Sequence, residues 1–224
     1  MRLFVVIPAY SRTIACETAG ALLQEQGAAL LAGVEMQVAF VPGTSLITQA
    51  RNQAVAEFLA SGADRMAFLD ADIAWEPGAL MKVAAAQRDF VGGAYRLKTA
   101  AESYPVHWIQ ERGELWADPE TGLLEVAALP GGFLSLSRDV FSRLAEAHPE
   151  RRYEHGGRTF HAYFHCPPGQ GEDGAFCADW RAAGGKVWLD PTLTLTHVDG
   201  ARAYTGCIGD WLRSRAPVSE EEAA

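Results

Sequence analysis

Two carboxylates stand one residue apart in the stretch FLDADIAW, at Asp70 and Asp72, directly after an apolar segment. Side chains alternate across a strand, so this spacing places both carboxylates on the same side at the strand's end. Like charges in close company repel each other, so the pair needs a bound cation, a shared proton or contact with water. The pair alone therefore leaves two alternatives, a metal site or a solvated turn in which Asp72 caps the next helix.

Three further segments carry residue types suited to chemistry. Glu172 and Asp173 stand between glycines in GQGEDGAF, at the expected start of a helix. The alternating strand TLTLTHV delivers His197 at its end, and Gly131 and Gly132 precede the apolar strand of ALPGGFLSLSR, where they allow a ligand close to the backbone. Each also has a structural explanation, which is helix capping for the acids, internal hydrogen bonding for the histidine and a tight turn for the glycines.

Apolar runs that fit buried strands alternate with segments of helical period in the first hundred residues. We expect strands at 3–7, 36–41, 65–70 and 89–95, and helices at 13–26, at 46–62 and after Pro77. Thr44 or Ser45 is expected to cap the second helix and Gly62 to end it. Four alternations of strand and helix predict a parallel sheet with helices on both faces.

The alternation of strands and helices ends after Lys98. Residues 99–126 contain short alternating stretches that predict a small β-rich insertion, and 148–171 predict a long loop. A strand and helix are expected within 127–141, a helix at 173–183, and strands in KVWLD and TLTLTHV. The acidic end VSEEEAA is expected to be disordered.

Composition excludes several classes of protein. The 224 residues are 49% hydrophobic, which suits one domain, and the net charge of -9 argues against nucleic-acid binding. The four cysteines show no paired spacing, and MRLFVVIPAY predicts a strand and not a signal peptide, so we expect a cytoplasmic protein. No apolar run reaches the roughly 18 residues that a transmembrane helix needs.

The order of these segments is more specific than any one of them. From Leu3 to about Val198 the chain resembles glycosyltransferases of the GT-A fold, particularly the family 2 type. The matching segments are VIPAY, ARNQAV, FLDADI, GGFLSLSR, GEDGAF and THV. The resemblance implies an α/β fold with a mostly parallel central sheet. It also implies an enzyme that moves a sugar from a nucleotide-diphosphate donor to an acceptor hydroxyl. It implies one domain at 1–210, with a nucleotide-binding half at 1–98 and an acceptor-binding half at 99–210, before a tail at 211–224.

The resemblance also implies a metal site. Asp70 and Asp72 match the DxD motif, whose second carboxylate usually touches the metal while the first faces the ribose or a metal-bound water. His197 matches a position that supplies a further ligand in many members. A divalent cation would neutralise the leaving pyrophosphate, and one imidazole among oxygen ligands favours Mn²⁺ over Mg²⁺.

Asp173 matches the family's catalytic base, with Glu172 to orient it. Residues expected around the nucleotide sugar are Pro8, Ala9, Tyr10, Arg12, Arg51, Asn52, Asp70, Ala71, Asp72, Gly131 and Gly132. Arg96 and Lys98 either add positive charge to this crevice or form a solvated strand end.

The second strand ends AFVPGTSL, without the aspartate that commonly contacts the base, so the base stays open and we expect a UDP- or GDP-sugar. That segment, with LDADIAWEPGAL and RDFVGG, also resembles Anp1-type mannosyltransferases, which retain the anomeric configuration. The presence of Asp173 favours inversion.

Two other classes share part of the pattern. A nucleotidyltransferase normally carries a Gly-rich basic loop after the first strand, and VIPAYSRTIA has none. A non-catalytic nucleotide-sugar-binding domain would be expected to have lost the DAD or GED residues, and both are intact.

The stretch RYEHGGRTFHAYFHC offers a zinc alternative through His161 and His165, but it lacks a CxxC partner. We expect it to be part of an acceptor-binding loop, with Tyr163, Phe164 and Trp108 as surfaces for stacking on sugars. The sequence does not identify the acceptor or the oligomeric state.

Overall fold

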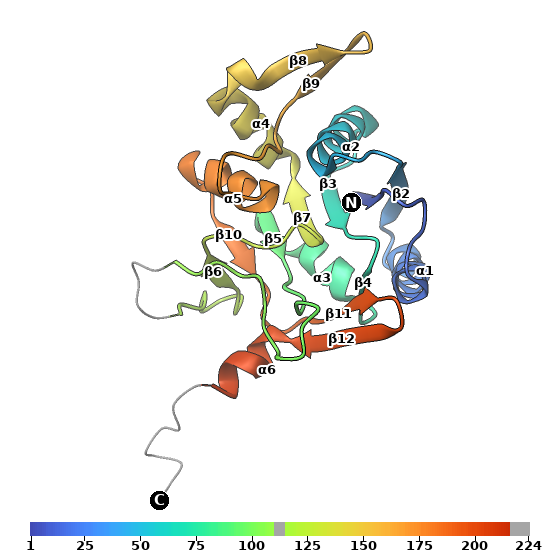
Figure 1. The fold of residues 1–224 in the computed structure, drawn as a ribbon, viewed down its shortest axis with the longest axis vertical. Coiled ribbons are helices and arrows are strands. Elements are labelled where there is room, and N and C mark those ends of the chain that lie inside the picture. Colours follow the sequence, from blue (N-terminus) through green and yellow to red (C-terminus); the bar gives the residue numbers. More distant parts are fainter. Residues whose placement is uncertain (110–114, 216–224) are drawn as a thin grey trace, which may run out of the picture.

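The computed structural model of the protein describes residues 1–109 and 115–215. Its centre is a seven-stranded sheet in the order β2-β1-β3-β7-β5-β10-β6 (Figure 1). The strands are β1 (Arg2–Ala9), β2 (Glu35–Pro42), β3 (Arg65–Leu69), β5 (Phe90–Gly92), β6 (Leu124–Val126), β7 (Phe133–Ser137) and β10 (Val187–Leu189). Only β7 and β6 run against the other five, so the predicted mostly parallel sheet is confirmed.

Helices cover both faces of this sheet because its strands are apolar on both sides. They are α1 (Cys16–Leu31), α2 (Ile47–Ser61), α3 (Ala79–Ala85), α4 (Arg138–Ala147) and α5 (Glu172–Ala182). In β1, Phe4 and Val6 pack with α2, α4 and α5, whereas Leu3, Val5 and Ile7 pack with α1 and α3. The continuous run LFVVI is therefore buried on both faces, as its composition predicts.

A second sheet at the end of the first has the order β12-β11-β4, from β4 (Ile73–Trp75), β11 (Thr194–Asp199) and β12 (Arg202–Cys207). In the antiparallel pair of β11 and β4, His197 lies opposite Ile73. Because Ile73 follows Asp72 directly, this register brings together two residues that are distant in sequence. The sequence did not predict β4 or β12.

Three local predictions need correction. Leu46, and neither Thr44 nor Ser45, precedes α2 as its cap residue, without a side-chain hydrogen bond, although Gly62 ends the helix in the left-handed conformation as predicted. The helix α6 (Ile208–Arg213) runs past residue 210, so the predicted tail is wrong at 211–213, and its residues 216–224 lie outside the described chain. The insertion at 99–126 was predicted to be rich in β-structure, but its described residues contribute one short strand, β6, and take part in two isolated bridges. Residues 110–114 lie outside the described residues.

The segment 148–171 is more regular than the predicted loop. It contains a short 3-10 helix (Pro149–Arg151) and a hairpin of β8 (Arg152–His155) and β9 (Arg158–His161). Gly156 and Gly157 form its tip, both with positive φ, at 56° and 74°. A two-residue turn with positive φ at both positions is the common hairpin turn, so this Gly-Gly pair was a usable signal.

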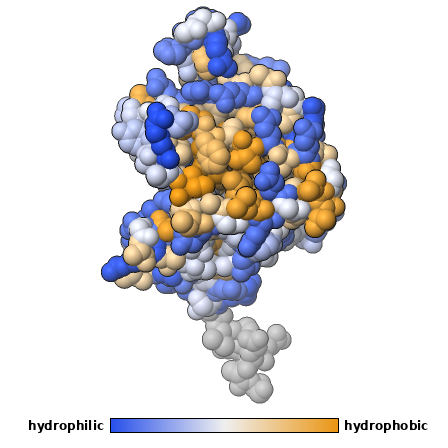
Figure 2. Space-filling view, turned by 90° about the vertical axis from the view of Figure 1, so that its right-hand side faces the viewer, coloured by the Kyte–Doolittle hydropathy of each residue, from blue (hydrophilic) through white to orange (hydrophobic). Residues whose placement is uncertain are grey.

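One face of the molecule carries a patch of apolar side chains, over β2 and α1 (Figure 2). The exposed large apolar residues of α1 and β2 include Leu30, Leu31 and Phe40. None of these three lines either of the two cavities that adjoin the candidate site. Among the described residues, no helix is long and apolar enough to cross a bilayer.

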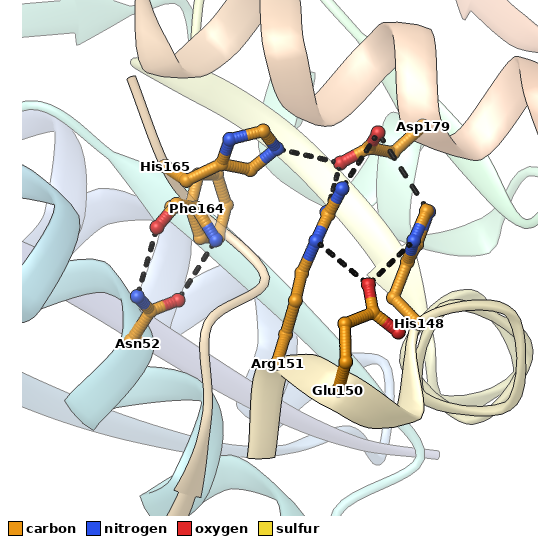
Figure 3. A network of polar contacts seen from close by, with 7 residues as sticks. All are labelled: Asn52, His148, Glu150, Arg151, Phe164, His165 and Asp179. Carbon is orange, nitrogen blue, oxygen red and sulfur yellow. Dashed lines mark hydrogen bonds and ion pairs between the residues drawn. The ribbon is translucent and has the colours of Figure 1, made fainter. Parts of the chain in front are cut away.

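Asn52 joins α2 to the chain that follows β9 (Figure 3). Its amide donates to the carbonyl of Phe164 at 2.9 Å, and its side-chain oxygen accepts from the N–H of Phe164 at 2.8 Å. Both hydrogen bonds are buried, so their loss leaves backbone groups without partners.

We therefore predict that Asn52→Ala lowers the free energy of unfolding by about 2 kcal/mol in urea titration. Gln53→Ala is the matched control, because the Gln53 amide makes only a contact with Glu57, one turn further along the same helix. Equal losses of stability in the two variants would contradict this assignment.

Candidate active site

The two acids of the DAD stretch lie in a turn and not in a strand. β3 ends at Leu69, the N–H of Asp70 donates to the carbonyl of Gly132 at 3.0 Å, and the N–H of Ile73 donates to the carbonyl of Asp70 at 3.2 Å. The strand alternation assumed from the sequence therefore does not apply here. Each carboxylate instead has its own set of partners.

Asp72 is held by two basic side chains. The same carboxylate oxygen, Oδ2, lies 2.6 Å from Lys98 Nζ and 3.3 Å from His197 Nε2. Burial alone would raise the pKa of Asp72, but hydrogen bonds from His197 and Lys98 outweigh it and lower the pKa to about 2. Asp72 is thus a carboxylate at any pH near neutrality.

The orientation of His197 is fixed from its other side. Nδ1 lies 2.9 Å from the carbonyl oxygen of Arg96, which can only accept, so Nδ1 carries a hydrogen. Nε2, on the other side of the ring, faces the carboxylate of Asp72. A metal-binding histidine usually donates one ring N–H to a backbone carbonyl or a carboxylate, as Nδ1 does here to Arg96, and binds the ion through its other nitrogen.

Asp70 has different neighbours. Its carboxylate accepts from the hydroxyl of Tyr95 at 3.2 Å and lies 3.5 Å from the Arg51 guanidinium. The Tyr95 ring also packs edge-on against the His197 ring, with centroids 4.9 Å apart. Burial, together with the charge of Asp70, raises the pKa of Tyr95 well above its ordinary value, so the hydroxyl remains a donor. Tyr95 was not among the residues predicted for the site, although it lies just beyond β5 (Phe90–Gly92).

Arg51 brings three carboxylates together. Its guanidinium is hydrogen-bonded to Asp173 and lies 3.4 Å from Glu172, in addition to its contact with Asp70. We call these four residues the Arg51 cluster. The Arg51 side chain is only 3% exposed, so its charge lies beneath the site. Arg51 and Asn52, both predicted to contact a nucleotide, instead have their side chains bonded to other parts of the protein.

Asp173 stands in the first turn of α5 with both oxygens engaged. One accepts from Arg51, and the other accepts from the N–H of Gly131 at 2.9 Å. A Cβ atom on Gly131 would lie 2.5 Å from Asp173, and one on Gly132 would lie 2.3 Å from Asp70. The paired glycines are therefore needed for these two carboxylates to approach the backbone.

A first cavity, of about 640 Å³, opens beside Asp72. Its lining residues are Pro8, Ser11, Thr13, Ile14, Ala15, Cys16, Glu17, Asp70, Ala71, Asp72, Val198 and Gly200. The N-terminus of α1 opens on this cavity, and the free N–H groups of such an end favour anions. Ser11 and Thr13, in the polar run SRT after the first strand, line this cavity, so that run could have predicted this part of the site.

Of the eleven predicted nucleotide contacts, Pro8, Asp70, Ala71 and Asp72 line the first cavity, whereas the other seven, among them Ala9, Tyr10 and Arg12, do not. Ala9 is buried within β1, Tyr10 is largely exposed, and the Arg12 guanidinium lies beside Gly43. A second cavity, of about 390 Å³, contains Asp173 and shares no lining residue with the first.

The three predicted metal ligands do not form one cluster. Within 1–109 and 115–215, no group of three or more His, Cys, Asp or Glu side chains is arranged to hold a metal ion. Asp72 and His197 do face each other, with oxygen and nitrogen 3.3 Å apart. Neighbouring ligands of a six-coordinate ion with bonds of about 2.1 Å lie about 3 Å apart. The spacing of the pair matches that of two neighbouring ligands of one such ion, and Lys98 Nζ contacts the same Asp72 oxygen at 2.6 Å.

A polar network braces α5 behind the site (Figure 3). Asp179 of α5 pairs with Arg151, lies 2.9 Å from His165 and 3.7 Å from His148, and His148 in turn lies 3.4 Å from Glu150. Burial raises the pKa of Asp179, but Arg151 and His165 reverse this effect and lower it. The brace fixes the helix that presents Asp173.

The same network accounts for the histidine-rich stretch. His165 is engaged by Asp179, and the described residues form no zinc cluster there. Tyr163 and Phe164 are buried in the core, so their predicted role as sugar-stacking surfaces is wrong. Trp108 packs partly against the same core.

No family model and no curated protein matches this sequence. Solved structures do match. A197 from STIV superposes with a TM-score of 0.59 at 21% identity, over 92% of this chain and 90% of A197. The glycosyltransferase GalNAc-T7, crystallised with UDP, GalNAc and Mn²⁺, gives 0.50 at 14% identity, over 89% of this chain but 44% of its own. S. aureus TarS (1–349) gives 0.49 at 12% identity, over 85% and 58%.

The chain has a GT-A glycosyltransferase fold. The predicted fold class is confirmed by this likeness. The finer resemblance to the family 2 type and to the Anp1 type stays a prediction, because matches at these identities establish the fold alone.

We predict that Gly132→Ala lowers the free energy of unfolding by about 1–3 kcal/mol, because its Cβ would displace Asp70 from Tyr95 and Arg51. Urea titration measures the effect. Gly20→Ala in α1 is the control, because no atom lies within 4 Å of its added Cβ and alanine favours a helix. A Gly132→Ala protein as stable as its parent would show that Asp70 has room to move.

Proposed function

We propose that this protein is a nucleotide-sugar-dependent glycosyltransferase that moves a sugar from a nucleotide-diphosphate donor to an acceptor hydroxyl. The observation that carries the proposal is the Arg51 cluster. One buried guanidinium contacts Asp70, which lines the first cavity, and Asp173, which lines the second. Donor and acceptor would thus meet where the two cavities approach each other.

The first cavity suits the donor. Its volume of about 640 Å³ accommodates a nucleotide sugar, and the N-terminus of α1 favours the phosphates. Asp72 and His197 would hold a divalent cation, for which we favour Mn²⁺ over Mg²⁺, and that ion would supply positive charge to the diphosphate as it leaves. The presence of UDP and Mn²⁺ in the GalNAc-T7 crystal supports a UDP-sugar, with a GDP-sugar as the alternative.

The second cavity supplies the base. Asp173 would accept the proton of the acceptor hydroxyl while that oxygen bonds to the anomeric carbon and the bond from this carbon to the diphosphate breaks. The nucleotide diphosphate leaves with the bonding electrons. Arg51 and the N–H of Gly131 hold the carboxylate in place, and Glu172 lies beside Arg51 at 3.4 Å. A base on the acceptor side favours inversion at the anomeric carbon.

The first test is a thermal-shift screen of UDP-, GDP-, CDP- and dTDP-sugars with and without Mn²⁺. A donor that binds only the native state at 100 times its Kd should raise the Tm by about 5–10 °C. We expect a UDP- or GDP-sugar to give this rise only when Mn²⁺ is present. The absence of a shift with every donor would overturn the proposed function.

Two substitutions separate binding from transfer. Asp72→Asn should abolish the Mn²⁺-dependent donor shift, because it removes the charged ligand. Asp173→Asn should keep the shift and lower the transfer rate roughly 10²- to 10⁴-fold, because it removes the base. Transfer is measured by release of the nucleotide diphosphate.

Asp139→Asn, at an exposed position of α4, is the matched control and should change neither measurement. If Asp173→Asn transfers sugar as fast as the parent, Asp173 is not the base.

A further inference from the structure

The second cavity has a composition that restricts what its ligand is. Residues from three parts of the chain line it, namely Pro105, His107, Ala127, Ala128, Leu129, Pro130, Gly169, Gln170, Gly171, Asp173, Gly174, Ala178 and Arg181. Asp173 is its only carboxylate among the described residues. The wall formed by 127–130 with Pro105 is apolar, so the middle of the cavity suits an apolar or flat part of a ligand.

The opposite wall is one face of α5. Gly174, Ala178 and Arg181 are spaced by four and three residues, so they lie on the same side of the helix. Small side chains in the first two positions let a ligand lie against the helix. Arg181 follows Asp173 by eight residues, which corresponds to about 12 Å along the helix axis.

Arg181 is exposed, and among residues 1–109 and 115–215 its guanidinium has no ion pair and no hydrogen bond. Other exposed arginines, such as Arg12, Arg152 and Arg202, also lack both kinds of contact within these ranges, but of these four only Arg181 lines the second cavity. His107 lines the same cavity from the facing wall. A guanidinium fits a carboxylate or phosphate with two parallel hydrogen bonds, so this end of the cavity suits an anionic group.

We infer that the acceptor is an anionic alcohol. Its hydroxyl lies at Asp173, an apolar segment follows the groove between α5 and residues 127–130, and a carboxylate or phosphate about 10–12 Å from the hydroxyl binds Arg181. This inference rests on the proposed function for the role of Asp173. The charge of the acceptor is a separate claim, which comes from Arg181.

Three probes built on a nine-carbon chain test the inference, each with a hydroxyl at one end and a carboxylate, a phosphate or a second hydroxyl at the other. They are 9-hydroxynonanoate, 9-hydroxynonyl phosphate and the neutral 1,9-nonanediol. Their affinities for the full chain are measured by isothermal titration without a donor. We expect at least one anionic probe to bind about tenfold more tightly than the diol, and the better of the two identifies the anion as carboxylate or phosphate.

Substitution at Arg181 locates the effect. Arg181→Met keeps the length of the side chain and should reduce the preference for the anionic probe to less than threefold, whereas Arg181→Lys should retain part of it. Arg213→Met, at an exposed position of α6 outside the cavity, is the matched control and should leave the preference unchanged.

The outcomes distinguish this inference from the proposed function. No preference for either anionic probe, or a preference that persists in Arg181→Met, overturns the anionic acceptor even if donors shift the Tm. A missing donor shift in the parent protein overturns the transferase proposal itself. Arg181→Met should retain the parent's donor shift, because Arg181 does not line the first cavity.

Discussion

The arrangement of this site depends on the burial of one positive charge. The Arg51 side chain is 3% exposed, and a guanidinium in that position is stable only if carboxylates and hydrogen bonds compensate for its lost hydration. Asp70, Glu172 and Asp173 supply that compensation, while the rings of Phe68 and Phe164 flank the guanidinium at 5.9 and 5.4 Å. Because these carboxylates come from the turn after β3 and from α5, the same charge also holds two parts of the chain together.

Other features of the structure serve this constraint. Gly131 and Gly132 leave room for the carboxylates, and the peptide N–H of Gly131 completes the shell around Asp173. Asp179 holds α5 from behind, through the network with Arg151 and His165. Mutations that appear to be remote from the site would therefore act on the position of Asp173.

The sequence predicted the parts of the fold that local patterns determine. The run LFVVI predicted a strand buried on both faces, and Gly62 predicted the end of α2. The alternation of strands and helices predicted the sheet. The fold class followed from these signals together with the order of the motifs.

The rest depends on contacts that no local pattern encodes. Arg51 looks like any basic residue of an amphipathic helix, and only the packing of α2 under the sheet buries it. Tyr95 joins Asp70 to His197 through a loop beyond β5. A turn follows Leu69 where the end of a strand was expected, so Asp70 and Asp72 have separate partners. The Gly-Gly hairpin at 156–157 was the one missed element with a clear local signal.

The pairing of β4 with β11 has a consequence for how the protein matures. Asp72 and His197 are neighbours only because these strands pair across more than a hundred residues of intervening chain. Chains emerge from the ribosome from the N-terminus, so Asp72 is synthesised long before His197. The pair that would hold the cation cannot exist until β11 has been synthesised and has paired with β4. For most of its synthesis the chain therefore lacks one of the two residues of this pair.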